Sequence, residues 1–239
     1  MNIIGVDEAG RGPVLGPLVV CAVQLPQTDL NLLIEYGVND SKQHSPHQRS
    51  KIVEWFEGQA KQRNWQSALV VLEASVIDEW LQGSGMNALG VHGFQQAIQA
   101  LTVGDSCTLF LDACDVNAER FGQEVKQGLV DSTMLSVVSE HKADANYPIV
   151  SMASILAKHH RDCIIQSLAE ELSVEIGSGY PSDPTTRQAL HQLIQPTFIH
   201  DSVRRNWATA KNFWESTYGG HIPQRHEPLS HQHGLFDFD

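Results

Sequence analysis

The 239-residue chain lacks an apolar run that could cross a lipid bilayer. Its longest such run, residues 15–23, is interrupted by Gly16 and Pro17 and is shorter than the roughly 20 residues that a membrane helix needs. The N-terminus also lacks a charged segment followed by an apolar stretch, which is the pattern of a secretory signal. We therefore expect a cytoplasmic protein that does not associate with membranes.

Cysteine is scarce, and the four cysteines contain no C-x-x-C pair. Scattered cysteines of this kind suit a reducing cytosol, where they act as small buried hydrophobic residues. The rest of the composition, with 41% hydrophobic and 18% charged residues, is typical of a folded globular protein.

Positive charge is in short supply, because 16 Lys and Arg residues stand against 28 Asp and Glu, for a formal net charge of −12. A protein that grips nucleic acid usually carries a basic surplus. The acidic balance therefore argues against a general nucleic-acid binder. It argues less against a protein with a small footprint on nucleic acid, since bound divalent cations would reverse the sign of the charge locally.

Strand-like and helix-like segments alternate along the chain. Short apolar segments predict strands at residues 2–6, 17–25, 67–72, 108–112 and 134–138. Longer patterns predict helices that open at Ser45-Pro46 and at Asp183-Pro184, and others at residues 74–81, 86–101, 117–129, 150–172 and 207–214. This alternation predicts an α/β protein around one central sheet. We expect one domain over residues 1–218 and a flexible tail over residues 219–239, which are rich in Gly, Pro, His and polar residues.

Acidic residues end or closely follow three of the expected strands. They are Asp7-Glu8, Asp112 and Asp144. Ligand sites of α/β sheets lie beyond strand ends, so these acids can converge. Hard divalent cations such as Mg²⁺ prefer oxygen ligands, and two cations about 4 Å apart can clamp the attacking and leaving oxygens of a phosphodiester. Any one of these acids alone would be interpreted as a solvated loop residue, whereas the group predicts a metal site.

Asp7 and Glu8 pose a geometric problem, because neighbouring residues of a regular strand point to opposite faces. Gly10 and Gly12 follow directly, so we expect the strand to have ended in a tight turn that lets both acids serve one site. The same Gly10-Arg11-Gly12 segment is either a plain turn or a backbone that approaches a sugar or phosphate closely, with Arg11 supplying charge.

Five sequence blocks, taken in order, resemble the motifs of type 2 ribonucleases H, the ribonuclease HII family. The first is the Asp-Glu-Ala-Gly-Arg-Gly motif within residues 6–17, and the others lie at 40–42, 111–116, 142–162 and 177–183. The Lys-Ala-Asp and Gly-Ser-Gly-Tyr-Pro-Ser-Asp forms of the last two blocks are closest to the archaeal and eukaryotic branch. The resemblance spans roughly residues 2–215.

The resemblance implies a ribonuclease H-like fold with a central mixed sheet, flanking helices and a C-terminal helical segment. It implies an endoribonuclease that acts on RNA–DNA hybrids and on duplex DNA with embedded ribonucleotides, in replication and ribonucleotide excision repair. The catalytic metal ligands would be Asp7, Glu8, Asp112 and Asp144, holding two Mg²⁺ or Mn²⁺ ions. A metal-activated water would attack the phosphate 5′ to a ribonucleotide, leaving 3′-hydroxyl and 5′-phosphate ends, and the chain would act as a monomer.

The resemblance also implies substrate-binding residues. Gly10, Arg11 and Gly12 match a loop that senses the 2′-hydroxyl, which distinguishes RNA from DNA. Tyr180 matches a tyrosine that stacks on the sugar of the next nucleotide, although on residues alone it would as readily cap a core. Ser41, Lys42 and Lys158 would contact the phosphate backbone, while Lys158 alone could equally be a solvated helix residue.

The end of the chain resembles a peptide that binds the sliding clamp of replication. Gln232, Leu235 and Phe236 match that peptide, and His233 stands where leucine is usual. Exposed apolar residues in a polar tail have little reason to be there unless a groove receives them.

Two other functions remain open from the sequence. The first is a two-metal nuclease of the same fold without ribonucleotide specificity. The second is a non-catalytic protein that binds nucleic acid or the clamp. The four acids argue against the second, because a simple binder gains nothing from negative charge where a phosphate must lie.

Overall fold

The structure is a computed structural model that describes residues 1–38, 44–102, 107–129 and 135–225. The chain groups into two compact units. Unit 1 comprises residues 1–11, 18–72 and 84–163, and unit 2 comprises residues 12–17, 73–83 and those from 164 onward. The single domain expected over residues 1–218 is thus made of parts of both units.

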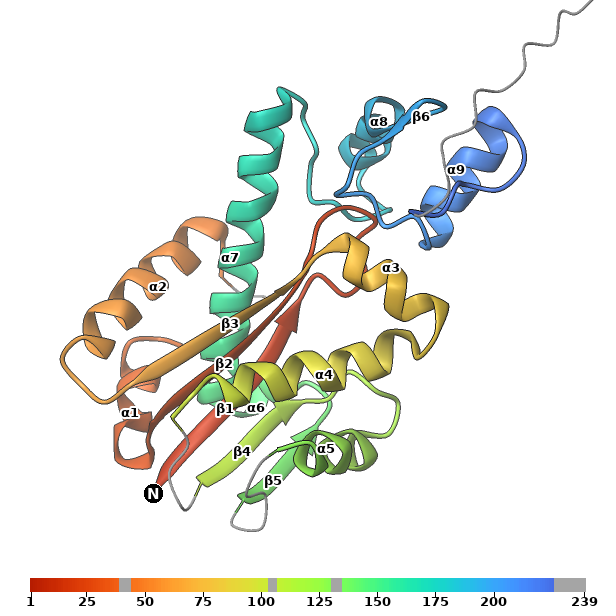
Figure 1. Cartoon of the computed structure of the whole chain (residues 1–239). Helices are drawn as coiled ribbons and strands as arrows, with labels where there is room; N and C mark the ends of the chain where they lie inside the picture. Colours follow the sequence, from red (N-terminus) through yellow and green to blue (C-terminus); the bar gives the residue numbers. More distant parts are fainter. Residues whose placement is uncertain (39–43, 103–106, 130–134, 226–239) are drawn as a thin grey trace, which may run out of the picture. The chain divides into compact units, whose positions relative to one another are not determined.

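Unit 1 is built on a mixed sheet (Figure 1). Its strands are β1 (Asn2–Ala9), β2 (Leu18–Pro26), β3 (Gln66–Leu72), β4 (Cys107–Asp112) and β5 (Leu135–Glu140), in the spatial order β3-β2-β1-β4-β5. The pairs β1–β2 and β2–β3 are antiparallel, and the pairs β1–β4 and β4–β5 are parallel. These strands confirm the five expected from sequence and the mixed α/β class.

The helices largely follow the sequence patterns. The described helices are α1 (Leu30–Glu35), α2 (Pro46–Ala60), α3 (Ala74–Gln82), α4 (Gly85–Gln99), α5 (Ala118–Gln127), α6 (Ala143–Asn146), α7 (Pro148–Leu172), α8 (Pro184–Leu193) and α9 (Ala208–Tyr218). The expected start of α2 is confirmed by a reciprocal capping box between Ser45 and Gln48. The sequence did not predict α1, α6 or the small β6–β7 hairpin (Ile194–Gln195 and Phe198–Ile199), which are too short to show periodicity. None of the described helices is both long and apolar enough to span a membrane.

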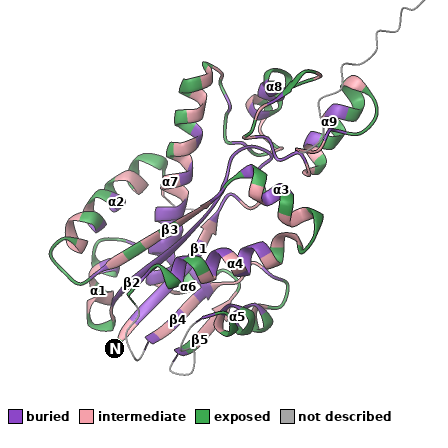
Figure 2. Cartoon of the chain, in the orientation of Figure 1, coloured by how far each residue is buried: buried purple, intermediate pink, exposed green. Residues whose placement is uncertain are grey.

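The two faces of the sheet pack differently. Even-numbered residues of β1, such as Ile4 and Val6, join an apolar cluster with residues of α4 and α5. On the odd-numbered face, a Cβ atom at Gly5 would lie 2.4 Å from the backbone of Ile149 at the start of α7. Glycine at this position therefore lets α7 lie directly on the sheet, and Figure 2 shows buried residues on the strands and on this end of α7.

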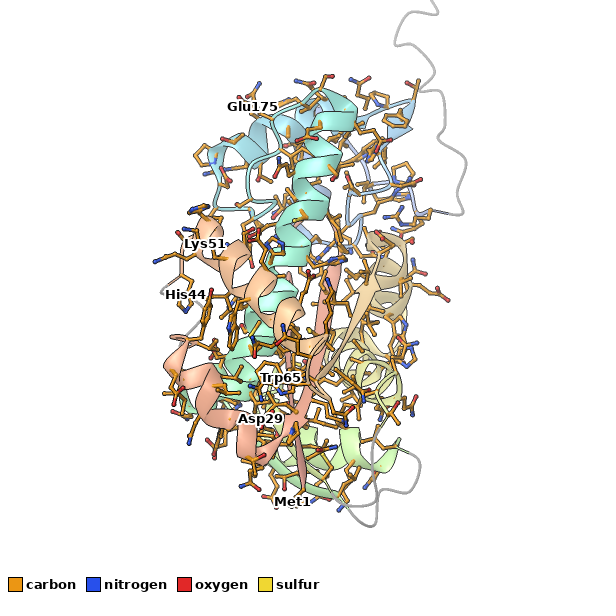
Figure 3. All side chains as sticks on the ribbon, turned by 90° about the vertical axis from the view of Figure 1, so that its left-hand side faces the viewer. Met1, Asp29, His44, Lys51, Trp65 and Glu175 are labelled. Atoms are coloured by element: carbon orange, nitrogen blue, oxygen red, sulfur yellow. The ribbon has the colours of Figure 1, made fainter. Side chains whose placement is uncertain are left out.

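The remaining helices of unit 1 are fixed by aromatic and polar contacts. Trp65 lies just before β3 and donates from its indole nitrogen to Asp29 at 2.8 Å, while its ring lies 5.6 Å from that of Phe56 on α2. Figure 3 labels Asp29 and Trp65 on the side of the sheet covered by α1 and α2.

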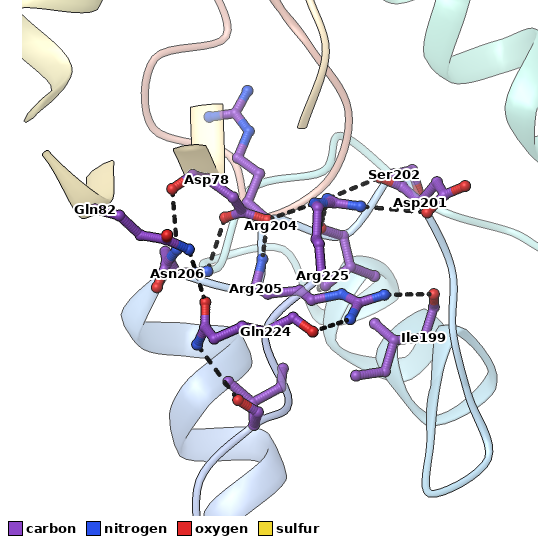
Figure 4. A network of polar contacts seen from close by, with 12 residues as sticks. Asp78, Gln82, Ile199, Asp201, Ser202, Arg204, Arg205, Asn206, Gln224 and Arg225 are labelled. Atoms are coloured by element: carbon purple, nitrogen blue, oxygen red, sulfur yellow. Dashed lines mark hydrogen bonds and ion pairs between the residues drawn. The ribbon is translucent and has the colours of Figure 1, made fainter. Parts of the chain in front are cut away.

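Unit 2 combines an apolar cluster with a buried polar network. The cluster includes Val14, Leu190 and Trp214 from the 12–17 loop, α8 and α9. In the network, the buried Asp78 carboxylate accepts from the backbone N–H groups of Arg205 and Asn206 and from Nε of Arg225 at 2.8–3.0 Å (Figure 4).

The start of the expected tail is part of unit 2. Ile222 is 2% exposed, and Arg225 also donates to the Val203 carbonyl at 2.7 Å. The expectation of a flexible tail from residue 219 is therefore wrong for residues 219–225. Residues 226–239, with the clamp-peptide residues Gln232, Leu235 and Phe236, lie outside the described part of the chain.

Candidate active site

Asp7 and Asp112 lie on neighbouring parallel strands and on the same face of the sheet. Val6 on β1 pairs with Leu111 on β4, and both face the apolar cluster, so the residues that follow them face the opposite side. Asp144 lies on α6, directly after β5. One carboxylate oxygen from each of the three acids lies within 4.8 Å of the others. The structure thus brings together three of the four predicted ligands.

The segments that carry Asp112 and Asp144 are bonded to each other. The backbone N–H of Ala143 donates to the Asp112 carboxylate at 2.9 Å, and that of Ala113 donates to the Glu140 carbonyl at 2.9 Å. These bonds orient the Asp112 carboxylate and fix the spacing of the two strand ends.

Asp115 braces the loop after β4. This buried carboxylate accepts from Arg120 and from the backbone of Asn117, and its carbonyl accepts from Nε2 of His141 at 2.7 Å. The hydrogen bond from Arg120 holds the pKa of Asp115 below its ordinary value. The loop next to Asp112 is therefore rigidly held to the end of β5.

The Asp7 carboxylate is costly to ionise. Burial raises its pKa well above the ordinary value, and the charge of Asp112 raises it further. Ser154 and Lys158, both on α7, oppose these effects. The Lys158 amino group donates to the Ser154 hydroxyl at 2.8 Å. The lysine predicted to contact phosphate thus also supplies positive charge near Asp7.

The three carboxylates fit a divalent cation. Asp7 and Asp144 are 4% and 3% exposed, so their charges are withdrawn from water, and a bound cation would offset that cost. The donor set consists of carboxylate oxygens, which suits Mg²⁺ or Mn²⁺ better than soft metals that prefer thiolate and imidazole.

Glu8 lies outside this group of three. β1 continues through Ala9, with Asp7 and Glu8 paired to Cys21 and Val20, so the expectation that the strand ends before these acids is wrong. Glu8 therefore points to the α4 face, where its Oε1 lies 3.4 Å from Nη1 of Arg11. Burial raises the pKa of Glu8, the Arg11 charge and the Cys114 thiol lower it, and the charge of Asp112 raises it.

The predicted glycine loop begins at the end of β1. Gly10 turns the chain with a φ of +93°, and Arg11 donates from Nη2 to Oδ1 of Asn87 on α4 at 2.5 Å. All of these contacts lie within unit 1.

Gly12 and Tyr180 meet in unit 2. A Cβ atom at Gly12 would lie 3.4 Å from the Tyr180 ring, which is in van der Waals contact range. Tyr180 is 40% exposed, which speaks against a role as a core cap. The backbone N–H groups of Val14 and Leu15 donate to the Gly179 carbonyl, so the loop and the Tyr180 segment are directly bonded.

Two predicted site residues, Ser41 and Lys42, lie outside the described part of the chain. Three residues near the site were not predicted from the sequence: Asn87, Gly90 and Trp207. The Trp207 indole nitrogen donates to the Gly12 carbonyl at 3.0 Å. No local sequence signal marks them, because their partners are distant in the chain.

The mixed sheet, with carboxylates gathered at the ends of its strands, defines an enzyme of ribonuclease H-like fold. A family model described as Ribonuclease HII matches residues 4–210, and the chain belongs to this family. The chain is accordingly an endoribonuclease of RNA–DNA hybrids.

Individual relatives agree with this assignment. The chain is 40% identical to the ribonuclease HII of Methanocella arvoryzae over 211 residues, covering 87% of this chain and 90% of the relative. It is 41% identical to that of Pyrococcus abyssi over 219 residues, covering 90% and 92%. Among solved structures it resembles the ribonuclease H2 of Pyrococcus horikoshii, with a TM-score of 0.80, 38% identity and coverage of 90% and 98%.

A second solved structure is the PCNA:RNase HII complex of Archaeoglobus fulgidus. It matches this chain with a TM-score of 0.74 and 32% identity, covering 88% of this chain and 95% of the other.

Proposed function

We propose that the chain cuts the RNA strand of RNA–DNA hybrids and also cuts 5′ to ribonucleotides embedded in duplex DNA, using two Mg²⁺ or Mn²⁺ ions and leaving 3′-hydroxyl and 5′-phosphate ends. The observation that carries the proposal is the convergence of the Asp7, Asp112 and Asp144 carboxylates, each with an oxygen within 4.8 Å of the others. Membership of the ribonuclease HII family supports it.

The carboxylates have distinct positions in this proposal. When bound, the cations would activate a water nucleophile and stabilise charge on the attacking and leaving oxygens of the phosphodiester. Asp7, Asp112 and Asp144, whose carboxylates lie together, would hold the cations from one side. Glu8, which points to the α4 side and pairs with Arg11, is proposed as the fourth ligand. Lys158 supplies positive charge beside Asp7.

Specificity for ribonucleotides would come from the loop and from Tyr180. Gly10, Arg11 and Gly12 are proposed to sense the 2′-hydroxyl, and Tyr180 to stack on the sugar of the following nucleotide. Within unit 2, Gly12 lies against the exposed Tyr180 ring, which supports a shared role for these two residues. Ser41 and Lys42 are proposed to bind the phosphate backbone.

A duplex with one embedded ribonucleotide tests the proposal. We expect a single cut 5′ to the ribonucleotide, a 3′-hydroxyl and a 5′-phosphate end, and no cutting of the all-DNA duplex. An RNA–DNA hybrid is the positive control. Equal cutting of the all-DNA duplex would favour a two-metal nuclease without ribonucleotide specificity, and binding without any cutting would favour a non-catalytic binder.

We also propose that the tail binds the sliding clamp, with the chain acting as a monomer on the nucleic acid. Gln232, Leu235 and Phe236 carry this proposal, and the clamp complex of the Archaeoglobus fulgidus relative supports it. Deletion of residues 231–239 should abolish clamp binding and leave cleavage of a short duplex unchanged. Clamp binding that survives the deletion would exclude the tail.

A further inference from the structure

Arg11 links a helix to a predicted metal ligand. Its Nη2 donates to Oδ1 of Asn87 at 2.5 Å, and its Nη1 lies 3.4 Å from Oε1 of Glu8. Asn87 lies in the first turn of α4, and its amide oxygen is the closer partner. An acceptor on a helix therefore contributes to the position of the guanidinium, and the guanidinium in turn lies close to the Glu8 carboxylate.

The surface of α4 leaves room for this arrangement at Gly90. A Cβ atom there would lie 2.8 Å from Sγ of Cys114, 3.3 Å from Nη1 of Arg11 and 3.8 Å from Oε2 of Glu8. Asn87 and Gly90 are three residues apart, so they lie on the same face of the helix. One face of α4 thus carries Asn87, which accepts from Arg11. One turn further along, Gly90 leaves space for the side chains of Arg11, Cys114 and Glu8.

Glu8 needs such support because of its place on β1. The strand directs it to the α4 face, while Asp7 beside it faces α7. Oε2 of Glu8 is buried and has no hydrogen-bond partner among the described residues, and the Cys114 thiol lies near the same carboxylate. Glutamate has three rotatable side-chain bonds, so without a partner its carboxylate would lose a defined orientation.

We propose that Asn87 is a positioning residue, which holds Glu8 through Arg11 in the orientation required for cation binding. The inference rests on the proposed function, in which Glu8 is the fourth ligand. In this inference the Arg11 side chain supports a metal ligand, whereas the backbone of the Gly10–Gly12 segment is still proposed to sense the 2′-hydroxyl of the ribose. Removing a residue that is hydrogen-bonded to a metal ligand commonly lowers metal affinity or activity by roughly 10- to 100-fold.

The test replaces Asn87 by leucine, which has a similar size but no acceptor. We expect Mn²⁺ affinity of the substrate-free protein, measured by calorimetric titration, to fall about tenfold. On the embedded-ribonucleotide duplex at subsaturating Mn²⁺, kcat should fall with KM for the duplex unchanged. Asn87→Asp keeps the acceptor and should retain an Mn²⁺ affinity close to that of the unmodified protein.

Gln96→Leu is the matched control, because Gln96 is exposed on the same helix and its side chain forms no hydrogen bond with the described residues. It should leave Mn²⁺ affinity, kcat and KM unchanged. The inference is overturned if Asn87→Leu raises KM while Mn²⁺ affinity is unchanged, since Arg11 would then act on the substrate. The Mn²⁺ titration needs no cleavage, so it tests the role of Asn87 alone. Failure of the unmodified protein to cut the ribonucleotide duplex would instead contradict the proposed function.

Discussion

Asp7 is a residue whose burial favours function at the expense of stability. Its carboxylate is 4% exposed and close to the charge of Asp112, and both effects raise its pKa. We predict that Asp7→Asn stabilises the metal-free protein, because a neutral amide avoids the cost of a buried charge. A gain of about 1 kcal/mol would raise the Tm by roughly 2–4 °C in a chain of this size.

The same substitution should remove the response to metal. Saturating Mn²⁺ should raise the Tm of the unmodified protein, because a ligand that binds only the folded state stabilises it. It should raise the Tm of Asp7→Asn much less, and cleavage should fall about 10³-fold, equivalent to about 4 kcal/mol of transition-state stabilisation. A metal-free variant that melts below the unmodified protein would contradict the electrostatic argument.

Asp183 gives a prediction for acid stability. Hydrogen bonds from the backbone and hydroxyl of Ser178 and from the Thr185 backbone lower its pKa from 3.8. Since the folded-state pKa is the lower one, the stabilisation is complete above the unfolded pKa and is lost as pH falls through the folded pKa. Asp183→Asn should therefore be less stable than the unmodified protein at pH 7, with the difference shrinking below pH ~4. Denaturant unfolding at several pH values measures this; a difference that grows in acid would contradict it.

At the scale of elements, the contact between β1 and α7 depends on Gly5. A methyl group there would lie 2.4–2.6 Å from backbone atoms of Ile149 and Val150, and backbone cannot rotate aside as a side chain can. We predict that Gly5→Ala destabilises the protein by about 1–3 kcal/mol or more. Because α7 also carries Ser154 and Lys158, cleavage should fall as well.

Gly58→Ala is the matched control for this prediction. Gly58 lies within α2, and a Cβ atom there meets nothing within 4 Å. The substitution should stabilise the protein by about 0.5–1 kcal/mol, because alanine favours the helix and restricts the unfolded chain. Urea unfolding compares both variants, and equal stability of the two would show that α7 shifts without cost.

The loop of residues 12–17 depends on α9 and the segment before it. The Trp207 indole donates to the Gly12 carbonyl at 3.0 Å, and Nε of the fully buried Arg204 donates to the Gly16 carbonyl at 2.9 Å. The Arg204 guanidinium lies 5.0 Å from the centre of the Trp207 ring. Two neighbouring side chains thus hold both ends of the loop.

Trp207→Phe should loosen the loop while keeping an aromatic ring for Arg204. The loss of one hydrogen bond of about 1 kcal/mol predicts a roughly fivefold fall in kcat/KM on the embedded-ribonucleotide duplex. Mn²⁺ affinity should not change. Trp214→Phe is the control, because Trp214 lies in the apolar cluster of unit 2 but, among the described residues, donates no hydrogen bond to the loop. It should lower the Tm with a smaller effect on kcat/KM. Equal effects of the two variants on kcat/KM would mean that the hydrogen bond is unimportant.

These contacts mark the limit of what the sequence reveals. Strands and helices could be predicted because apolar periodicity is local, and the convergence of Asp7, Asp112 and Asp144 follows from strand ends that share an edge. The contact of Arg11 with Asn87 joins residues 76 apart, and that of Trp207 with Gly12 joins residues 195 apart. Such pairs depend on tertiary packing. The sequence did not predict that Glu8 and Asp7 point to opposite faces of the sheet, because this depends on the residue at which β1 ends. Strand ends are among the features that a sequence predicts least reliably.

At the scale of the whole molecule, the C-terminal part of the chain has two different segments. Residues up to Arg225 belong to the packed part of unit 2, where Arg225 pairs with the buried Asp78 and Arg205 donates to the Pro223 carbonyl. The residues that resemble a clamp peptide follow only after this segment. Stability and clamp binding should therefore be separable by truncation.

Two truncated chains, 1–225 and 1–218, test this separation. Chain 1–225 should unfold at the same urea concentration as the full chain and cut a short ribonucleotide duplex equally well, but it should not bind the clamp. Chain 1–218 loses Ile222 and leaves Asp78 without the Arg225 guanidinium. We expect it to be less stable by about 3 kcal/mol or more, since removing one partner of a buried ion pair costs about 3–5 kcal/mol. Equal stability of the two truncated chains would show that residues 219–225 contribute nothing to the stability of unit 2. Clamp binding by chain 1–225 would show that the binding segment lies outside residues 226–239.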